Sequence, residues 1–518
     1  MARPQEKLAD SLKALKELQE RGVVAIRSAD LTRTHRERLL QNGFLHEVMK
    51  GWYIPARPDG AGGESTDWYT SFWGFCAAYL NDRFGTEWSL SPEQSLSLHA
   101  GNRAVPHQLL VRSPKAGNEV TKLPHETSLL DVRAALPPEG QREEKEGLRL
   151  FSLAAALIAC APGYFPQNPT DARAALAMVR DASDVLALLL AGGHSALGGR
   201  LAGAFRNVGR TRIADEILKT MRAASYDVRE NDPFSDRPTL ALPAREQSPH
   251  ANRVRLMWQQ MRNTVMGMFP AAPGPVTDID AYLEAVEDVY VTDAYHSLSI
   301  EGYRVSPALI ERVRTGAWNP DGDENDHERL NALAARGYWK AYEAVGQSVR
   351  KVLEGDNPGA VVDADHGDWY RELFAPSVTA GIMKPADLAG YRSDQVYIQR
   401  SRHVPPRHEA VRDLMPAFFD LLREEEEPSV RVVLGHFVFV YIHPYKDGNG
   451  RMGRFLMNVM LAGGGYPWTV LPVEKRNEYM AALEAASIEQ NIEQFAAFLA
   501  RLVEARLKGH PAPRVPDE

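Results

Sequence analysis

Residues 441–454, "YIHPYKDGNGRMGR", constrain this chain more than any other stretch. The preceding segment, "EPSVRVVLGHFVFVYI", is long, apolar and opened by Pro428, which indicates a buried helix that ends near His443. The following segment, "RMGRFLMNVMLA", has helical spacing and is stopped by glycines 463–465. The chain is therefore expected to fold here as a helix, a glycine-rich turn and a second helix.

The turn has the composition of an anion-binding site. Glycines around Asn449 let consecutive backbone N–H groups face one anion, and the N-terminus of the next helix adds its dipole. On that helix Arg451, Arg454 and Asn458 share one polar edge, whereas the apolar residues form the core face. Two guanidinium groups held in this way can bind phosphate oxygens.

Two further side chains suit phosphate chemistry. The carboxylate of Asp447 can hold Mg²⁺, which prefers oxygen ligands and usually bridges substrate phosphates. His443, with an ordinary pKa near 6.5, can accept a proton at neutral pH. A base, a metal ligand, an anion site and two cations together predict attack of a hydroxyl on a nucleotide phosphate.

A competing interpretation is a dinucleotide-binding turn, because Gly448, Gly450 and Gly453 spell G-x-G-x-x-G. That fold needs a parallel sheet of alternating strands and helices, and an acidic residue about 20 positions further on. Glu474 lies at about that distance, but the region offers few strands. The phosphate-transfer interpretation is therefore preferred.

The composition is that of an ordinary globular protein, and any basic surface on it must be local. With 518 residues the chain is expected to form several domains, and its net charge of −8 gives no global basic signature. Both cysteines lie in apolar contexts, the N-terminus lacks a signal-peptide pattern, and the apolar stretches are too short for a membrane span. We therefore expect a cytoplasmic protein without membrane contact.

The N-terminus has the pattern helix, helix, hairpin, which is the plan of a winged helix. The second helix, "SADLTRTHRERLLQNGF", has Ser28 or Thr32 as its cap and Gly43 as its end, and "FLHEVMKGWYIP" reads as two strands around a turn. This helix and turn carry a basic face fit for DNA, and the candidate contacts are Arg33, Arg36, Arg38 and Lys50.

The remaining chain divides by composition. Residues 57–225 mix strand-like and helical patterns and carry no chemistry that can be named, and residues 226–250 are rich in proline and charge, as a linker is. We predict a mainly α protein: a winged-helix module at 1–56, a mixed α/β regulatory region at 57–225, a linker at 226–250, a helical catalytic domain at 251–508 and a tail at 509–518.

The motif resembles the signature of the Fic (filamentation induced by cAMP) family, H-x-F-x-D/E-G-N-G-R-x-x-R. It matches at every specified place except that Tyr445 stands where Phe is usual. The resemblance extends over about residues 255–505. It includes "DLAGYRSDQVYIQRSRHVPP", which is strand-like around 394–406. This segment looks like the family's β-hairpin flap, which binds the target protein as an added strand.

More weakly, "LLQNGFLHEVMKGWYIP" resembles winged-helix regulators of the AbiEi type.

The resemblance implies a helical Fic core that transfers AMP from ATP, with Mg²⁺, to a Ser, Thr or Tyr hydroxyl of a target protein. It assigns the base to His443 and the metal ligand to Asp447. The anion site falls to Gly448, Asn449 and Gly450, and phosphate binding to Arg451 and Arg454. The unaltered "GNGR" favours AMP transfer over the phosphorylation of the Doc type.

A second resemblance lies upstream, in "YHSLSIEGYRVS". Ser297, Glu301 and Gly302 fit S/T-x-x-x-E-G/N, the inhibitory helix motif of some Fic proteins. In those relatives the glutamate pairs with the second arginine of the signature, here Arg454. A carboxylate beside an arginine in a phosphate site competes with the phosphate for the same donors, so the resemblance implies autoinhibition.

Two other functions remain open from the sequence. The chain is alternatively a DNA-binding regulator or antitoxin-like protein whose Fic part is a sensor, or a deAMPylase in which Glu301 positions water. The partners that we expect are ATP, a hydroxyl-bearing target protein, DNA for the N-terminal module, and a second copy in a homodimer, as Fic relatives often form.

Overall fold

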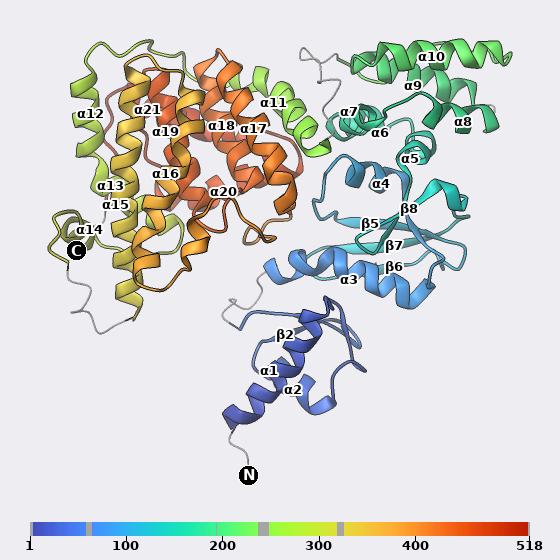
Figure 1. The fold of residues 1–518 in the computed structure, drawn as a ribbon, viewed down its shortest axis with the longest axis horizontal. Coiled ribbons are helices and arrows are strands. Elements are labelled where there is room, and N and C mark those ends of the chain that lie inside the picture. The colour runs from blue at the N-terminus through green and yellow to red at the C-terminus, as the bar shows by residue number, and fades with distance from the viewer. Residues whose placement is uncertain (1–3, 59–64, 193, 237–247, 319–325, 516–518) are drawn as a thin grey trace. The chain divides into compact units, whose positions relative to one another are not determined.

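The computed structural model describes residues 4–58, 65–192, 194–236, 248–318 and 326–515. The chain forms two compact units. The first unit is Met1–Pro249 with Tyr397–Val404, and the second unit is His250–Val396 with Pro405–Glu518. Most of the described chain is helical, with small sheets in the first unit, so the predicted mainly α fold is confirmed (Figure 1).

The first unit opens with two helices and a three-stranded antiparallel sheet of order β1-β3-β2. Its elements are α1 (Pro4–Glu20), β1 (Ile26–Arg27), α2 (Arg33–Gln41), β2 (Leu45–Met49) and β3 (Trp52–Pro55). Thr32 caps α2, because its side chain accepts a hydrogen bond from the backbone N–H of His35. The predicted helix and hairpin are present, whereas the winged-helix assignment and the DNA-binding role stay predictions.

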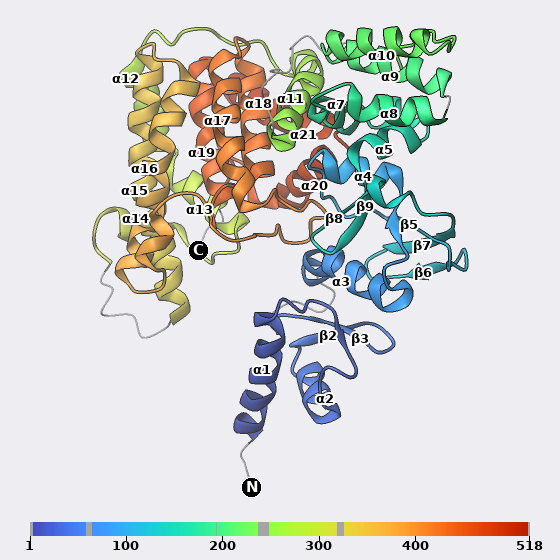
Figure 2. The same ribbon diagram turned by 45° about the vertical axis from the view of Figure 1, so that its right-hand side comes forward.

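A four-stranded sheet of order β4-β5-β7-β6 follows, in which β5 and β7 are parallel. The helix α3 lies along this sheet and shares an apolar core with it (Figures 1 and 2). The elements are α3 (Thr66–Phe84), β4 (Ser89–Leu90), α4 (Pro92–His99), β5 (Gln108–Ser113), β6 (Val120–Lys122), β7 (Ser128–Arg133), β8 (Arg142–Lys145) and β9 (Leu148–Phe151).

The first unit ends in a group of helices with its own apolar core. They are α5 (Leu153–Ala159), α6 (Tyr164–Gln167), α7 (Pro169–Met178), α8 (Ser183–Gly192), α9 (Ser195–Asn207) and α10 (Thr211–Ala223). Val228 and Phe234 are buried in this core. The prediction of a linker from residue 226 onward is therefore corrected for residues 226–236, whose apolar side chains pack on the helices. Residues 237–247 lie outside the described residues.

The second unit consists of helices around one apolar core. They are α11 (Pro249–Met268), α12 (Ile279–Asp288), α13 (Tyr290–Ile300), α14 (Pro307–Arg314), α15 (Asp326–Leu353), α16 (Pro358–Thr379), α17 (His408–Glu424), α18 (Pro428–Ile442), α19 (Asn449–Gly463), α20 (Arg476–Ile488) and α21 (Glu493–Leu507). Among the residues that the structure describes, no helix is long and apolar enough to cross a membrane.

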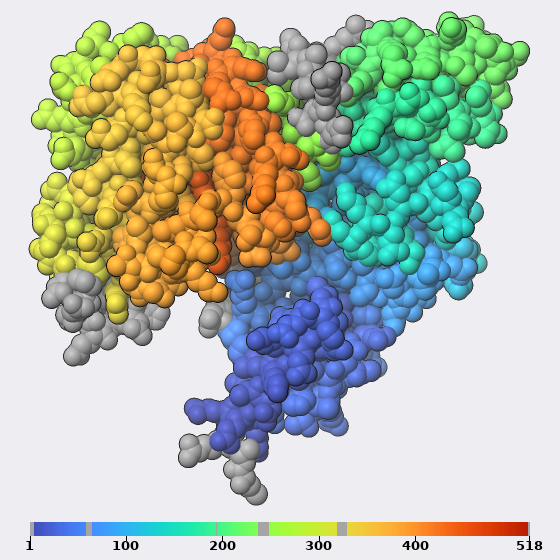
Figure 3. All heavy atoms as spheres, viewed as in Figure 1, coloured from blue at the N-terminus to red at the C-terminus, as the bar shows by residue number. Residues whose placement is uncertain are grey.

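The helix α18 lies inside this unit because it is apolar on all sides. Proline occupies its first turn, and nearly every following side chain is buried. It packs against α19, the helix that follows residues 443–448, which are called the motif loop below, and α15 packs along α16. In the space-filling view the visible face of this unit is formed mainly by residues coloured from yellow to orange, which lie closely against one another (Figure 3).

The β-hairpin expected around 394–406 is wrong, because no strand forms there. Backbone carbonyls of this segment are bonded to side chains instead. Gln395 donates to the carbonyls of Val396 and Pro405, and the guanidinium of Arg392 donates to those of Asp394 and Pro406. The two prolines at 405 and 406 also lack the N–H that a ladder needs.

Candidate active site

His443 lies at the C-terminal end of α18 in a left-handed conformation, with φ 54° and ψ 59°. Its Nδ1 lies 3.2 Å from the carbonyl oxygen of Val440. Because a carbonyl only accepts, Nδ1 carries the proton and Nε2 keeps its lone pair. Burial, with a smaller effect of the nearby Arg392 cation, lowers the pKa of His443 to about 4. The side chain is thus a neutral base.

The loop after His443 is held by Asn449. Its Oδ1 accepts from the backbone N–H of Tyr445 at 2.9 Å, and its Nδ2 donates to the carbonyl of the same residue at 2.9 Å. Gly448 has φ 78°, and a Cβ there would lie 2.7 Å from the ring of Phe374. The side chain of Asn449 therefore shapes the loop, and an anion at this place would meet the backbone N–H groups at the start of α19.

Arg451 and Asp447 form the next part of the site. Only 2% of the Arg451 side chain is exposed, and its guanidinium lies between the rings of Tyr303 and Phe374, 5.2 and 5.0 Å from their centroids. Its Nη2 is 3.5 Å from the Asp447 carboxylate, and its buried Nε has no partner among the described residues. An unpartnered buried donor here suits an incoming phosphate oxygen.

Asp447 could serve as a metal ligand. Its side chain is 60% exposed, and one oxygen accepts from the backbone N–H of Gly448 at 2.6 Å. Among the described residues no cluster of three or more His, Cys, Asp or Glu could hold a metal ion. A Mg²⁺ ion at Asp447 would thus take its remaining ligands from nucleotide phosphates and water, as this ion usually does.

The guanidinium of Arg454 is hydrogen-bonded to residues at the C-terminal end of α13. Its Nε donates to Ser297 Oγ at 2.8 Å, and its Nη2 donates to the Ser297 carbonyl at 3.0 Å and to Glu301 Oε1 at 2.7 Å. The arginine side chain is 4% exposed and that of the glutamate 29%. Burial opposes ionisation of Glu301, but Arg454 and then Arg451 outweigh it and hold the pKa of Glu301 below its ordinary value. Both groups are charged.

Two glycines permit this pairing. Gly302 has φ 91°, which lets the chain leave α13 directly after Glu301. A Cβ on Gly450 would lie 2.3 Å from Glu301 Oε1, so a larger residue at 450 is incompatible with this position of the carboxylate. The motif loop and the predicted inhibitory helix are therefore shaped to fit one another.

The structure also adds residues that the sequence did not single out. Arg392 is buried, and its Nε donates to the His443 carbonyl at 2.8 Å. Asp293, one helical turn before Ser297, accepts from Tyr338 Oη at 2.6 Å. No spacing rule marks either residue, because their partners come from distant parts of the chain.

Two polar residues near the motif have structural roles. His436 is buried with Nε2 2.8 Å from Tyr479 Oη, as expected of a packed core histidine. Asn458, predicted to share the arginine edge, instead bonds to the backbone N–H and carbonyl of Thr469. It fixes the chain that follows α19.

The predicted DNA contacts are largely engaged inside their own module. The three arginines of α2 have the following partners: Arg33 pairs with Glu37, Arg36 donates to the Ser28 carbonyl, and Arg38 donates to the Lys7 carbonyl and to Ser11 Oγ. Lys50 is exposed in the hairpin turn. The basic face is thus less available than the sequence suggested.

Comparisons with known proteins agree with the site. Residues 367–461 match the model of the Fic/DOC family. The protein adenylyltransferase Fic of Drosophila willistoni is 30% identical over 232 residues, which is 44% of this chain and 43% of that protein. That of Nematostella vectensis is 29% identical over 233 residues, 44% of this chain and 50% of that protein.

Solved structures of similar proteins include Fic-1 (residues 134–508) from C. elegans, with a TM-score of 0.36 and 18% identity over 66% of this chain and 87% of that one. A Fic domain-containing signaling protein from Bacteroides thetaiotaomicron has a TM-score of 0.34 and 16% identity over 50% of this chain and 100% of that one. The chain spans about half or less of the length of the curated relatives named above.

The helices and loop around His443 thus form a Fic/DOC domain. The chain therefore contains a match to the Fic/DOC family over residues 367–461, and over 44% of its length it is related to the protein adenylyltransferases named Fic.

Proposed function

We propose that this protein is a Mg²⁺-dependent protein adenylyltransferase that transfers AMP from ATP to a hydroxyl side chain of a target protein and is restrained by its own Glu301. The observation that carries the proposal is the fit between two halves of one site. One half is the neutral base His443 with the glycine-rich loop that follows it. The other half is Glu301 at the C-terminal end of α13, whose Oε1 accepts a hydrogen bond from Nη2 of Arg454, the second arginine of the motif, at 2.7 Å.

The residues of the loop suggest how the transfer proceeds. His443 Nε2 accepts the proton of the target hydroxyl as its oxygen bonds to the α-phosphorus of ATP. The bond from that phosphorus to the β-phosphate breaks, and pyrophosphate leaves. The backbone N–H groups at the start of α19, with Arg451, stabilise the negative charge on the phosphates. A Mg²⁺ ion held by Asp447 would supply further charge neutralisation on the phosphates.

Glu301 opposes this reaction by occupying Arg454. The carboxylate takes one donor, Nη2, and neutralises the guanidinium charge that would otherwise attract a terminal phosphate. Arg454 is buried, so removal of the carboxylate alone leaves this guanidinium charged and available to the nucleotide. The restraint is thus reversible and local to α13.

The test is an intact-mass measurement. We expect Glu301→Gly incubated with ATP and Mg²⁺ to gain the mass of one or more AMP groups, and the double variant with His443→Ala to gain none. An adduct that persists without His443 would contradict its role as the base, and no adduct on Glu301→Gly or on an offered protein substrate would contradict AMP transfer.

The DNA-binding function has weaker support, because the arginines of α2 bond within the module. A gel shift on duplex DNA tests it. Binding that weakens with salt and is lost in the Arg33→Ala, Lys50→Ala variant would support it.

A further inference from the structure

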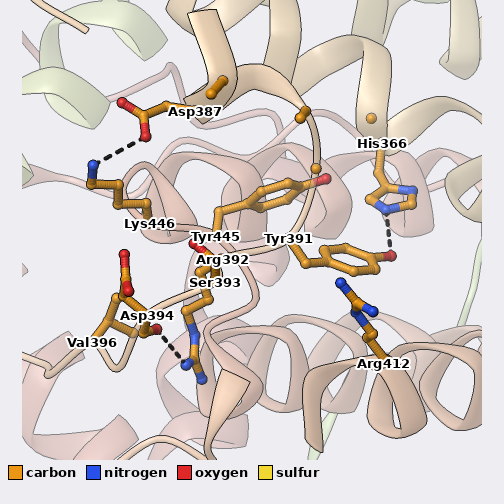
Figure 4. A pocket seen from close by; sticks show the side chains of 14 residues that line it. His366, Asp387, Tyr391, Arg392, Ser393, Asp394, Val396, Arg412, Tyr445 and Lys446 are labelled. Carbon is orange, nitrogen blue, oxygen red and sulfur yellow. Dashed lines mark hydrogen bonds and ion pairs between the residues drawn. The ribbon is translucent and has the colours of Figure 1, made fainter. Parts of the chain in front are cut away.

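A cavity of about 500 Å³ opens in the second unit beside the motif loop. Its lining comes from α16, the 3₁₀ turn η2 (Pro385–Leu388), residues 389–396, α17 and the loop itself (Figure 4). This volume is within the range of roughly 300–1,000 Å³ that is common for ligand pockets. Nothing in the transfer of AMP described above uses it.

The cavity is joined to the catalytic base. Tyr445 and Lys446, the second and third residues after His443, form part of its wall. Arg392, also in the wall, donates from Nε to the His443 carbonyl at 2.8 Å and from its backbone N–H to the Pro444 carbonyl at 2.9 Å. A molecule in the cavity therefore lies directly beside the segment that carries the base.

Most polar groups of the wall are already paired, so the cavity is preformed. His366 Nδ1 faces two backbone carbonyls and carries the proton, so Nε2 accepts from Tyr391 Oη at 3.0 Å. Burial lowers the pKa of His366 and keeps it neutral. Lys446 Nζ donates to Asp387 at 3.1 Å.

The charges of the wall do not balance. Its cations are Arg392, Arg412 and Lys446, and its carboxylates are Asp387 and Asp394. Figure 4 shows both carboxylates on the side of Lys446 and Arg392, whereas Arg412 lies on the other side, next to Tyr391. No residue that the structure describes forms an ion pair with Arg412. An exposed guanidinium beside Tyr391 that has no carboxylate partner among the described residues is a good receptor for a carboxylate.

We propose that this cavity receives the segment of the target protein next to the modified hydroxyl, and that Arg412 selects an acidic side chain in that segment. The inference rests on the proposed function, since it assigns the substrate's sequence preference to the same site. Arg412 thereby acts on specificity and not on the transfer step.

The experiment uses the full-length Glu301→Gly protein with ATP, Mg²⁺ and a peptide library in which one Ser, Thr or Tyr is flanked by random residues. Modified peptides are sequenced by mass spectrometry. We expect Asp and Glu to be enriched at least about threefold at one fixed flanking position. Added Arg412→Glu should abolish or reverse this preference, and Arg412→Lys should keep part of it.

The matched control is Arg312→Glu, which reverses an exposed arginine on α14 that does not line the cavity. It should leave the preference unchanged. Three results would overturn the inference while leaving AMP transfer intact. They are an acidic enrichment in the Arg412→Glu protein equal to that without this substitution, the absence of acidic enrichment in both proteins, and automodification without modification of any peptide. Absence of AMP on both peptides and protein would instead overturn the proposed function, and this inference with it.

Discussion

His443 is the residue whose chemistry depends most on its surroundings. Burial lowers its pKa to about 4, so the neutral form that the proposed reaction needs as its base persists well below the ordinary histidine range. In the Glu301→Gly protein we predict that kcat/KM for ATP stays flat from pH 8 to about 5 and falls only toward pH 4. A pH–rate profile whose acidic limb lies at 6.5 or above would contradict this environment.

Tyr445 departs from the usual Phe, and the structure explains why this is tolerated. Its ring is stacked on Tyr370 with centroids 3.9 Å apart and an interplanar angle of 9°. Its hydroxyl has no hydrogen-bond partner among the described residues, and Tyr445 is one of the residues that line the cavity. The ring alone therefore accounts for its packing.

We predict that Tyr445→Phe changes the free energy of unfolding by less than about 0.5 kcal/mol, whereas Tyr445→Ala lowers it by roughly 3–5 kcal/mol because a buried ring is lost. Denaturant unfolding of both variants measures this. A large loss in Tyr445→Phe would show that the hydroxyl has a structural role.

Among the elements, α13 carries both a buried residue that affects stability and two residues of the proposed restraint, Ser297 and Glu301 at its C-terminal cap. Asp293, Ser297 and Glu301 follow one another at four-residue intervals and so share one face of the helix. Asp293 is 5% exposed and accepts from Tyr338, and burial raises its pKa to about 6. The helix is therefore bonded to its neighbours at both ends of this face.

The raised pKa of Asp293 determines how the stability of the folded protein changes with pH. The folded protein binds this proton more tightly than the unfolded chain, so the contribution is complete below about pH 4 and is lost as the pH rises through about 6. Asp293→Asn keeps an acceptor for Tyr338 without the buried charge. We predict that the melting temperature of the variant minus that of the parent increases as the pH is raised from 4.5 to 7.5. A difference that does not vary with pH would contradict this.

The sequence predicted the elements that depend on local patterns and missed those that depend on distant contacts. The apolar run before His443 and the spacing after Asn449 predicted α18 and α19, because burial and periodicity are local properties. The pairing of Glu301 with Arg454 followed only from a family resemblance. The cavity beside Tyr445 could not be predicted, because its wall joins segments about 80 residues apart in the chain. The hairpin failed because alternation alone does not supply a partner strand.

At the scale of the whole molecule, the chain returns to the first unit at Tyr397–Val404. Within that unit Val404 is buried, Arg402 donates to the Val105 carbonyl, and the Val105 N–H donates to the Arg402 carbonyl. A chain that begins at residue 250 lacks these partners.

We predict that such a fragment of the Glu301→Gly protein keeps AMP transfer, because the core of the second unit is its own, but is cut by trypsin at Arg400 or Arg402 at least about tenfold faster than the full-length protein. Equal cleavage rates would show that the first unit does not protect this segment.

The account depends most directly on Glu301 as the restraint. The decisive measurement is the initial rate of AMP incorporation by the parent, by Glu301→Ala and by Glu311→Ala, at equal ATP and Mg²⁺. Glu311 is a matched acidic control whose arginine partner, Arg314, lies on its own helix, α14. We predict a rate at least about tenfold higher for Glu301→Ala, equivalent to about 1.4 kcal/mol, and no change for Glu311→Ala. Equal rates for the parent and Glu301→Ala would contradict the account.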